Sequence, residues 1–232
     1  MGMQAFNRFR REWGRATLGL ALSARAAPVT LAGMGLVSAP ARALALAEGV
    51  DFKTLARPQT VEVAAGKIEV IEFFGYWCPH CHALEPDLQA WRAKQAADVV
   101  LRKLPVAFRP NQAPFQHAYF ALEALGKADA TASAIFGAIH TERKTVESID
   151  DLAEIVVKAG VDRAKFLELA GSFAIQAKAR RVAQVAEAFA IDGVPCLAVA
   201  GKWITSPSLA GSRDKALSVV DELIARERRK TR

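Results

Sequence analysis

Two cysteines separated by two residues, Cys78 and Cys81, are the strongest chemical signal in this sequence. The chain holds only 3 cysteines in 232 residues, so it is not a small domain stapled by disulfides. Thiols at this spacing can close a disulfide with each other and exchange it with a third thiol. Pro79 and His80 lie between them, and His80 can donate a hydrogen bond to the Cys78 sulfur or place positive charge near it. A more stable Cys78 thiolate would make the disulfide more oxidising.

Two other uses of such a cysteine pair are a zinc site and a structural disulfide. A zinc site needs two further ligands, and the sequence has no second C-x-x-C motif and no H-x₃-H motif. His80 and His82 lie too close to the pair to complete a tetrahedron. A disulfide that closes so short a loop would add little stability. We therefore expect thiol chemistry and no metal.

The elements around the pair predict where each cysteine lies. The apolar run Ile68–Gly75 indicates a buried strand. A helical pattern begins at Pro79, a residue favoured at the first helical position; its apolar residues are Leu84, Leu88 and Trp91. Cys78 is thus expected at the helix N-terminus, where free N–H groups and the helix dipole stabilise a thiolate. Cys81, one turn further, is the more shielded partner, so we expect a substrate thiolate to attack the exposed sulfur of Cys78.

Two charged residues, Glu72 and Lys103, interrupt apolar strands that are candidates for neighbours in one sheet. Lys103 lies in a second predicted strand, Val99–Phe108. Buried charges are costly unless they are paired. One interpretation is that either side chain points to a sheet edge, or that Lys103 extends its ammonium group into solvent. The other is a partly buried pair beneath the cysteines, in which Glu72 relays or balances charge as Cys81 loses its proton.

A long helical block follows the second strand, with apolar residues that recur at spacings of three and four. Ser148 and Asp162 are expected to cap two of its helices. The last helix is predicted over Ser172–Ile191, with Phe173 on its inner side.

The chain closes with a short hairpin and one more helix. The hairpin strands are predicted at Cys196–Ala200 and Trp203–Thr205, after a loop that ends at Pro195. A short edge strand is expected at Val61–Val63, and the final helix at about Arg213–Arg228. This order of elements predicts an α/β core with an all-helical insertion.

The first 47 residues are typical of a secretory signal peptide. Arginines precede an Ala/Leu/Gly-rich stretch, and an A-x-A pattern predicts cleavage after Ala47. An uncleaved membrane anchor is the alternative, but no uninterrupted run approaches the roughly 20 apolar residues of a membrane span. This segment contributes +5 of the net charge of +7, which leaves +2 and gives no support for a nucleic-acid partner. Export would place the cysteines in an oxidising compartment.

Three features of the sequence combine into a family pattern. They are Cys78-Pro79-His80-Cys81 after Glu72-Phe73-Phe74, the helical insertion, and Gly193-Val194-Pro195 before the hairpin. Together they resemble the DsbA family of exported bacterial thiol oxidases over almost all of the chain after residue 47. The resemblance implies a thioredoxin-like fold formed by residues 48–110 and 176–232, with a helical insertion domain at 111–175.

The resemblance also implies that the protein donates a disulfide to reduced, newly exported proteins in the periplasm. Cys78 would be the nucleophile and Cys81 would resolve the mixed disulfide. Glu72 falls on the family's buried acid, Lys103 on its partner lysine, and Val194-Pro195 on the cis-proline loop that holds the substrate backbone. The implied redox group is the Cys78–Cys81 disulfide, without an external cofactor. The implied reoxidising partner is a quinone-coupled membrane protein of the DsbB type, and a monomer is expected.

Cys196, directly after Pro195, departs from this family pattern. It is either close enough to Cys78 to form a regulatory or off-pathway disulfide, or a small buried apolar residue of a strand. Two other functions stay open: a disulfide isomerase or reductase, and a non-catalytic chaperone or metal carrier that uses Cys78, His80 and Cys196. Isomerases of this type carry an extra dimerisation domain, for which the sequence leaves no segment.

Overall fold

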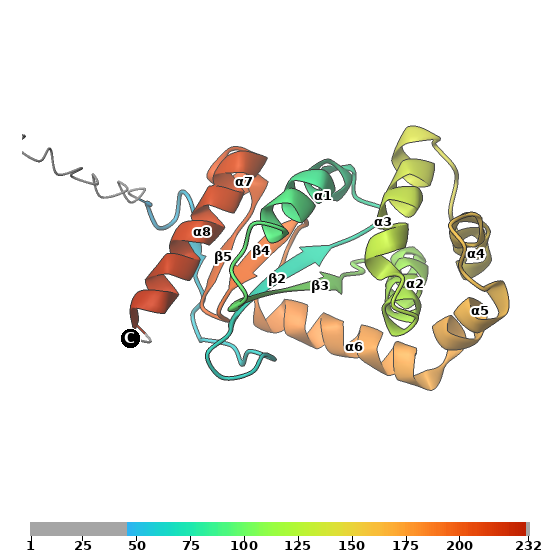
Figure 1. The fold of residues 1–232 in the computed structure, drawn as a ribbon, viewed down its shortest axis with the longest axis horizontal. Helices are drawn as coiled ribbons and strands as arrows, with labels where there is room; N and C mark the ends of the chain where they lie inside the picture. The colour runs from blue at the N-terminus through green and yellow to red at the C-terminus, as the bar shows by residue number, and fades with distance from the viewer. Residues whose placement is uncertain (1–45, 231–232) are drawn as a thin grey trace, which may run out of the picture. The chain divides into compact units, whose positions relative to one another are not determined.

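A five-stranded sheet organises the part of the chain that the structure describes. The computed structural model describes residues 46–230; residues 1–45, which hold nearly all of the predicted signal peptide, lie outside the described part. The strands are β1 (Lys53–Thr54), β2 (Ile68–Phe74), β3 (Val99–Pro105), β4 (Cys196–Val199) and β5 (Trp203–Thr205). Their order in the sheet is β1-β5-β4-β2-β3, with β2 and β3 parallel and the other neighbours antiparallel (Figure 1). A parallel pair completed by an antiparallel hairpin is the α/β core that the sequence predicted.

Strand β2 lies between β4 and β3, and all of its residues are buried because helices cover both faces of the sheet. The covering helices are α1 (Pro79–Arg92), α6 (Phe173–Ala188) and α8 (Arg213–Lys230). Side chains alternate between the faces of a strand. Val70 packs with Leu84 on the face of α1 and α8, whereas the ring of Phe73 lies 5.3 Å from that of Phe189 at the end of α6. In Figure 1, α6 accordingly passes on the opposite side of the sheet from α1.

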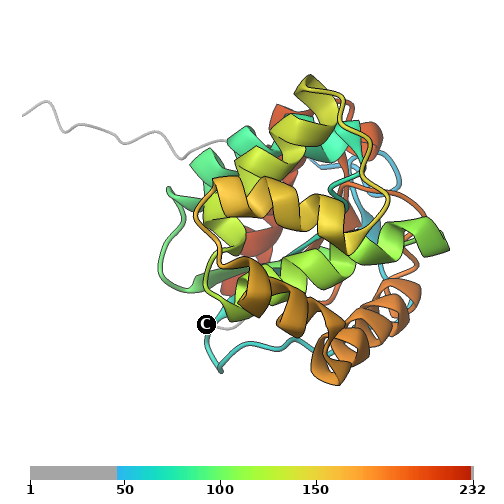
Figure 2. The ribbon, with the colours of Figure 1, turned by 90° about the vertical axis from the view of Figure 1, so that its right-hand side faces the viewer.

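The segment between β3 and β4 forms the predicted helical insertion. Its elements are η1 (Pro110–Gln112), α2 (Ala113–Ala124), α3 (Ala128–Phe136), the π-helical turn η2 (Gly137–Thr141), α4 (Ile149–Lys158) and α5 (Arg163–Gly171), after which α6 returns to the sheet. The helices gather at one end of the sheet, which faces the viewer in Figure 2. Ser148 and Asp162 cap α4 and α5 as predicted, because each side chain accepts a hydrogen bond from the N–H three residues later. A short helix, α7 (Pro207–Ala210), precedes α8.

Three expectations about local structure were wrong. Val61–Val63 forms no strand; the sheet edge is β1, which pairs with β5. Strand β3 ends at Pro105 rather than at residue 108. Phe173 is 79% exposed, because the inner stripe of α6 consists of Ile175, Ala179, Val182 and Ala186. Phe173 precedes the first of these by two residues and therefore lies on the other side of the helix.

The division into a thioredoxin-like domain (48–110 and 176–232) and an insertion domain (111–175) stays a prediction. Helix α6 begins at Phe173 and so crosses the second predicted boundary.

Within residues 46–230, none of the helices combines the length and the apolar character needed to cross a membrane.

Candidate active site

The two cysteines of the C-x-x-C motif lie at the start of α1, as the sequence predicted. Cys78 is the N-cap residue and Pro79 is the first residue of the helix. Both thiols are free, and Cys81 is fully buried. Cys78 is the more accessible of the two, but it is only 5% exposed, less than expected. The loop before β4 covers it: the Cys78 thiol donates a hydrogen bond to the Val194 carbonyl oxygen at 3.4 Å.

The surroundings separate the acidities of the two thiols. The pKa of Cys78 is lowered to about 6. The largest cause is a hydrogen bond from the Cys81 thiol. Backbone N–H groups of Cys81 and His80 and the charge of His80 act in the same direction, and together these causes outweigh burial. Burial, followed by the interactions with Cys78 and Glu72, raises the pKa of Cys81 well above its usual range. His80 is exposed and Pro79 is exposed beside it. One sulfur is thus ready to carry negative charge at neutral pH, and the other holds its proton.

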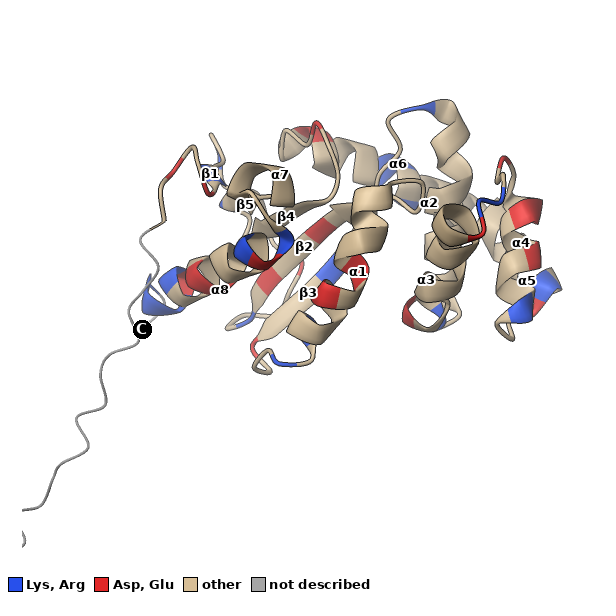
Figure 3. Cartoon of the chain, turned by 90° about the horizontal axis from the view of Figure 1, so that it is seen from above, with Lys and Arg blue, Asp and Glu red and all other residues tan. Residues whose placement is uncertain are grey.

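Glu72 and Lys103 form a buried charge cluster behind the cysteines, together with a third residue that the sequence analysis missed. The two lie opposite each other in the β2–β3 register, and the Lys103 ammonium is 3.3 Å from a Glu72 oxygen. Lys103 also hydrogen-bonds to Glu85 of α1. All three side chains are buried, so Lys103 does not extend into solvent. Figure 3 shows acidic segments on β2 and α1 near a basic segment of β3.

Glu85 is detectable in the sequence in retrospect. It follows Leu84 and lies four residues after Cys81, so a helix places it on the inward face of α1 with that cysteine. A carboxylate on an apolar helix face needs a buried cation, and Lys103 was the available candidate.

Glu72 is the unbalanced member of this cluster. Both of its carboxylate oxygens are buried, and within residues 46–230 neither accepts a hydrogen bond. Burial outweighs the attraction of Lys103 and raises the pKa of Glu72 to about 7. Lys103 behaves differently: burial acts against its charge, but Glu72 and Glu85 together raise its pKa. A carboxyl group near pKa 7 that interacts electrostatically with Cys81 is suited to exchanging a proton with it.

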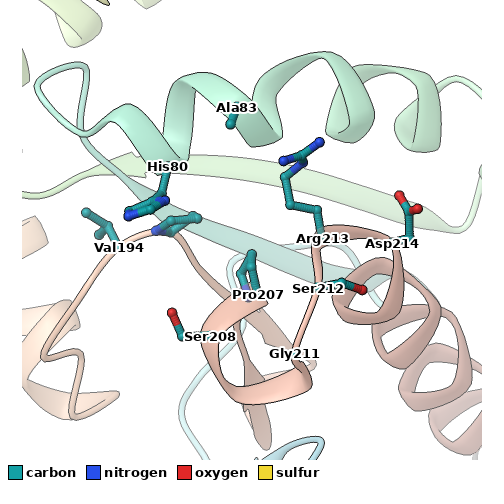
Figure 4. Close-up of a pocket in the computed structure, with 10 residues that line it drawn as sticks. His80, Ala83, Val194, Pro207, Ser208, Gly211, Ser212, Arg213 and Asp214 are labelled. Atoms are coloured by element: carbon teal, nitrogen blue, oxygen red, sulfur yellow. The ribbon is translucent and has the colours of Figure 1, made fainter.

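The loop before β4 forms one wall of a groove beside the cysteines. The Val194–Pro195 peptide bond is cis. With His80 of α1 and with Ser208 and Arg213 of the α7–α8 region, these residues line a cavity of about 390 Å³. Figure 4 shows His80 and Val194 on one side of it and the α7–α8 turn on the other.

Cys196 lies on a different side of the sheet from the charge cluster. It is paired with Phe73 in the β2–β4 register, so both side chains share the face on which Phe189 packs. Glu72, one residue before Phe73, points to the opposite face with α1. Cys196 is 7% exposed, and burial raises its pKa to about 12. This environment favours a small apolar core residue over a third redox thiol.

We predict that Cys196→Ala leaves disulfide exchange within about twofold of wild type, because the residue acts as a small buried hydrophobe. Peptide mass spectrometry of the oxidised wild-type protein should find the Cys78–Cys81 bridge and an unmodified Cys196 across glutathione buffers. A Cys78–Cys196 bridge in any of these buffers would restore the regulatory interpretation.

Among the described residues, no three His, Cys, Asp or Glu side chains are grouped as metal ligands.

Comparison with known proteins places the chain in a family. The DSBA-like thioredoxin domain matches residues 69–215. The thiol:disulfide interchange protein DsbA of Bordetella parapertussis is 43% identical over 184 residues, which cover 79% of this chain and 88% of that protein. The crystal structure of Pseudomonas aeruginosa DsbA matches with a TM-score of 0.75 and 35% identity, covering 79% of this chain and 95% of its own. The crystal structure of the oxidoreductase DsbA from Xylella fastidiosa matches with a TM-score of 0.74 and 31% identity. That match covers 79% of this chain and 98% of the Xylella chain.

These similarities agree with the fold and with the paired thiols at the start of α1. The fold is thioredoxin-like with a helical insertion, and the protein is a thiol–disulfide oxidoreductase. It exchanges disulfides with substrate proteins through a redox-active disulfide. The chain therefore belongs to the family of DSBA-like thioredoxin-domain proteins.

Proposed function

We propose that the chain donates disulfides to reduced, newly exported proteins through Cys78 and Cys81. The observation that supports this direction is the opposite shift of the two thiols: the pKa of Cys78 is lowered to about 6 and that of Cys81 is raised. At pH 7, a thiol with that pKa is about 90% thiolate. Because the thiolate exists only in the reduced protein, its stabilisation favours reduction of the pair and makes the disulfide a strong oxidant.

The proposed reaction has two exchanges. A substrate thiolate attacks the Cys78 sulfur of the Cys78–Cys81 disulfide, which forms a mixed disulfide and releases Cys81 as a thiolate. A second substrate thiolate then attacks the substrate sulfur of the mixed disulfide and expels the Cys78 thiolate. The substrate leaves oxidised by two electrons, and the enzyme keeps both electrons as a thiol–thiolate pair. The low pKa of Cys78 favours the second step, because a more stable thiolate is a better leaving group.

Glu72 is proposed as the proton source for Cys81 in the first exchange. Cys81 leaves as an anion in a buried site, where an uncompensated charge is costly. A protonated Glu72 can transfer its proton to Cys81, and Lys103 then offsets the negative charge that remains on Glu72. The distance of 3.3 Å between Lys103 and Glu72 supports this role, as does the pKa of Glu72, about 7.

The substrate, the partner and the cellular location follow from the same proposal. Val194 and Pro195 are proposed to hold the substrate backbone, because they line the groove beside His80 and Val194 contacts Cys78. Residues 1–47 are proposed to direct export to the periplasm and to be removed. A quinone-coupled membrane protein of the DsbB type is proposed to reoxidise the pair, and the enzyme to act as a monomer.

The reduction potential of the pair, measured against glutathione as a function of pH, tests the proposed direction. We expect a value above about −180 mV at pH 7, that of an efficient oxidant. Below pH 6 reduction takes up two protons, whereas above it Cys78 stays ionised and reduction takes up one. The slope should therefore change near pH 6 from about 59 to about 30 mV per pH unit. A potential near −270 mV, as in thioredoxin, with the break near pH 9, would instead indicate a reductase.

A further inference from the structure

The backbone turn that carries Cys78 is held in place by the helical insertion. The turn Gly75–Trp77 joins β2 to α1, and the Cys78 N–H closes it by donating to the Gly75 carbonyl at 3.0 Å. The carbonyl of Tyr76, in the middle of the turn, needs a donor from elsewhere. His140 supplies it, with its Nε2 atom 2.8 Å from the Tyr76 oxygen. Because a carbonyl oxygen can only accept, Nε2 carries the proton.

His140 is itself fixed by ring contacts with α1. It belongs to η2, a π-helical turn, and such turns occur frequently at functional sites. Its ring stacks on that of His82, with centroids 5.2 Å apart and planes 17° apart. His82 also stacks on Phe136, at 5.5 Å and 15°. The Tyr76 ring packs edge-on against the same Phe136 at 5.0 Å, so one face of the insertion holds both the backbone and the side chain of the turn.

The chemistry of Cys78 depends on the orientation of this turn. Its thiolate is stabilised by the Cys81 thiol and by backbone N–H groups of Cys81 and His80, and hydrogen bonds weaken steeply when they are misaligned. A rotation of the Tyr76–Trp77 peptide would move the Cys78 sulfur relative to these donors.

We propose that His140 is a positioning residue for Cys78. Its hydrogen bond to the Tyr76 carbonyl keeps the turn in the orientation in which the N-terminus of α1 stabilises the Cys78 thiolate. The helical insertion thereby contributes to the oxidising strength of the pair through a residue that does not touch the reacting sulfurs. This inference rests on the proposed role of Cys78 as the nucleophile.

Three single variants separate the hydrogen bond from the ring packing. His140→Phe keeps a ring that can stack on His82 but removes the donor. His140→Gln removes the ring and places an amide N–H close to the position of Nε2, so it should restore the bond to Tyr76. His117→Phe is the matched control, because His117 is also half-buried in the insertion, on α2.

The readouts are the thiolate absorbance of Cys78 during a pH titration, the equilibrium constant with glutathione, and the thermal unfolding midpoint. For His140→Phe we expect the titration midpoint to rise by about 0.5–1 pH unit, because the donors lose alignment. The equilibrium constant for reduction of the Cys78–Cys81 disulfide by glutathione should fall about three- to tenfold. This corresponds to a reduction potential lower by about 15–30 mV. His140→Gln should recover most of both effects, and His117→Phe should match wild type.

Two results would overturn the inference. One is a His140→Phe protein that titrates and equilibrates like wild type, whatever its unfolding midpoint, since His140 would then only pack. The other is a His140→Gln protein as impaired as His140→Phe. Failure of the proposed function looks different: the wild-type thiol itself would titrate near pH 9, and the comparison between variants would lose its basis.

Discussion

Replacing Cys81 with serine is expected to convert the enzyme into a trap for its partners. Cys78 stays reactive, because backbone N–H groups and His80 still contribute to lowering its pKa. It forms a mixed disulfide with oxidised glutathione or with an oxidised substrate, but no second thiol of the motif can resolve it. Intramolecular attack by a well-placed thiol is far faster than attack from solution, so the lifetime of the adduct should increase by about 1,000-fold or more. Non-reducing electrophoresis and intact-mass spectrometry would detect it.

Cys78→Ser is the matched variant for this experiment. Cys81 is fully buried and its pKa is raised by burial, so it should form almost no adduct under the same conditions. Both variants are best made in a Cys196→Ala background, which removes the third thiol. Equal adduct formation by Cys78→Ser and Cys81→Ser would contradict the assigned order of attack.

Lys103→Met is expected to have the largest effect on stability, a loss of about 3–5 kcal/mol at pH 8. Lys103 is the cation shared by Glu72 and Glu85, and its removal leaves two buried carboxylates without a counterion. The loss should depend on pH. Removing Lys103 removes the charge that lowers the pKa of Glu72, so that pKa rises further in the folded state. Destabilisation therefore begins above the unfolded pKa of Glu72, about 4.3, and grows until its folded-state pKa is passed. Urea unfolding at pH 4.5 and pH 8 should show a small loss and a large loss, respectively.

A surface lysine provides the control for Lys103→Met. Lys178 pairs with Glu123 at 3.0 Å, but its side chain is 52% exposed, so Lys178→Met should cost at most about 1 kcal/mol. A loss for Lys103→Met that is equal at both pH values would mean that lost packing, not the unpaired carboxylates, causes it. The free energy of unfolding of the wild type should itself fall as the pH rises from about 4.5 to about 7. Over this range the unfolded chain releases the Glu72 proton, whereas the folded state keeps it up to about pH 7.

Local patterns in the sequence predicted most of the fold and part of the candidate active site. The apolar run before Cys78 and the helical period after Pro79 were sufficient to place both cysteines at a helix start. Glu72 was detectable because it places a charge inside that run. These features depend on neighbours a few residues apart, whose spacing the sequence displays directly.

The missed features depend on contacts between distant segments. The cover over Cys78 comes from Val194, and the partner of the Tyr76 carbonyl comes from His140. Phe173 was predicted on the inner side of its helix, but its position on α6 turns it outward. A local sequence pattern does not indicate which loop covers which helix in the folded chain.

The pairing of β1 with β5 has a consequence for how the molecule assembles during synthesis. Lys53 lies opposite Ile204, and β4, which separates β5 from β2, is also made late. A chain that ends before residue 194 therefore has an open sheet edge along β2 and a C-x-x-C motif without its covering loop. Long-range pairings of this kind slow folding. Until residues 194–205 have joined the sheet, Cys78 is therefore more accessible than in the folded enzyme.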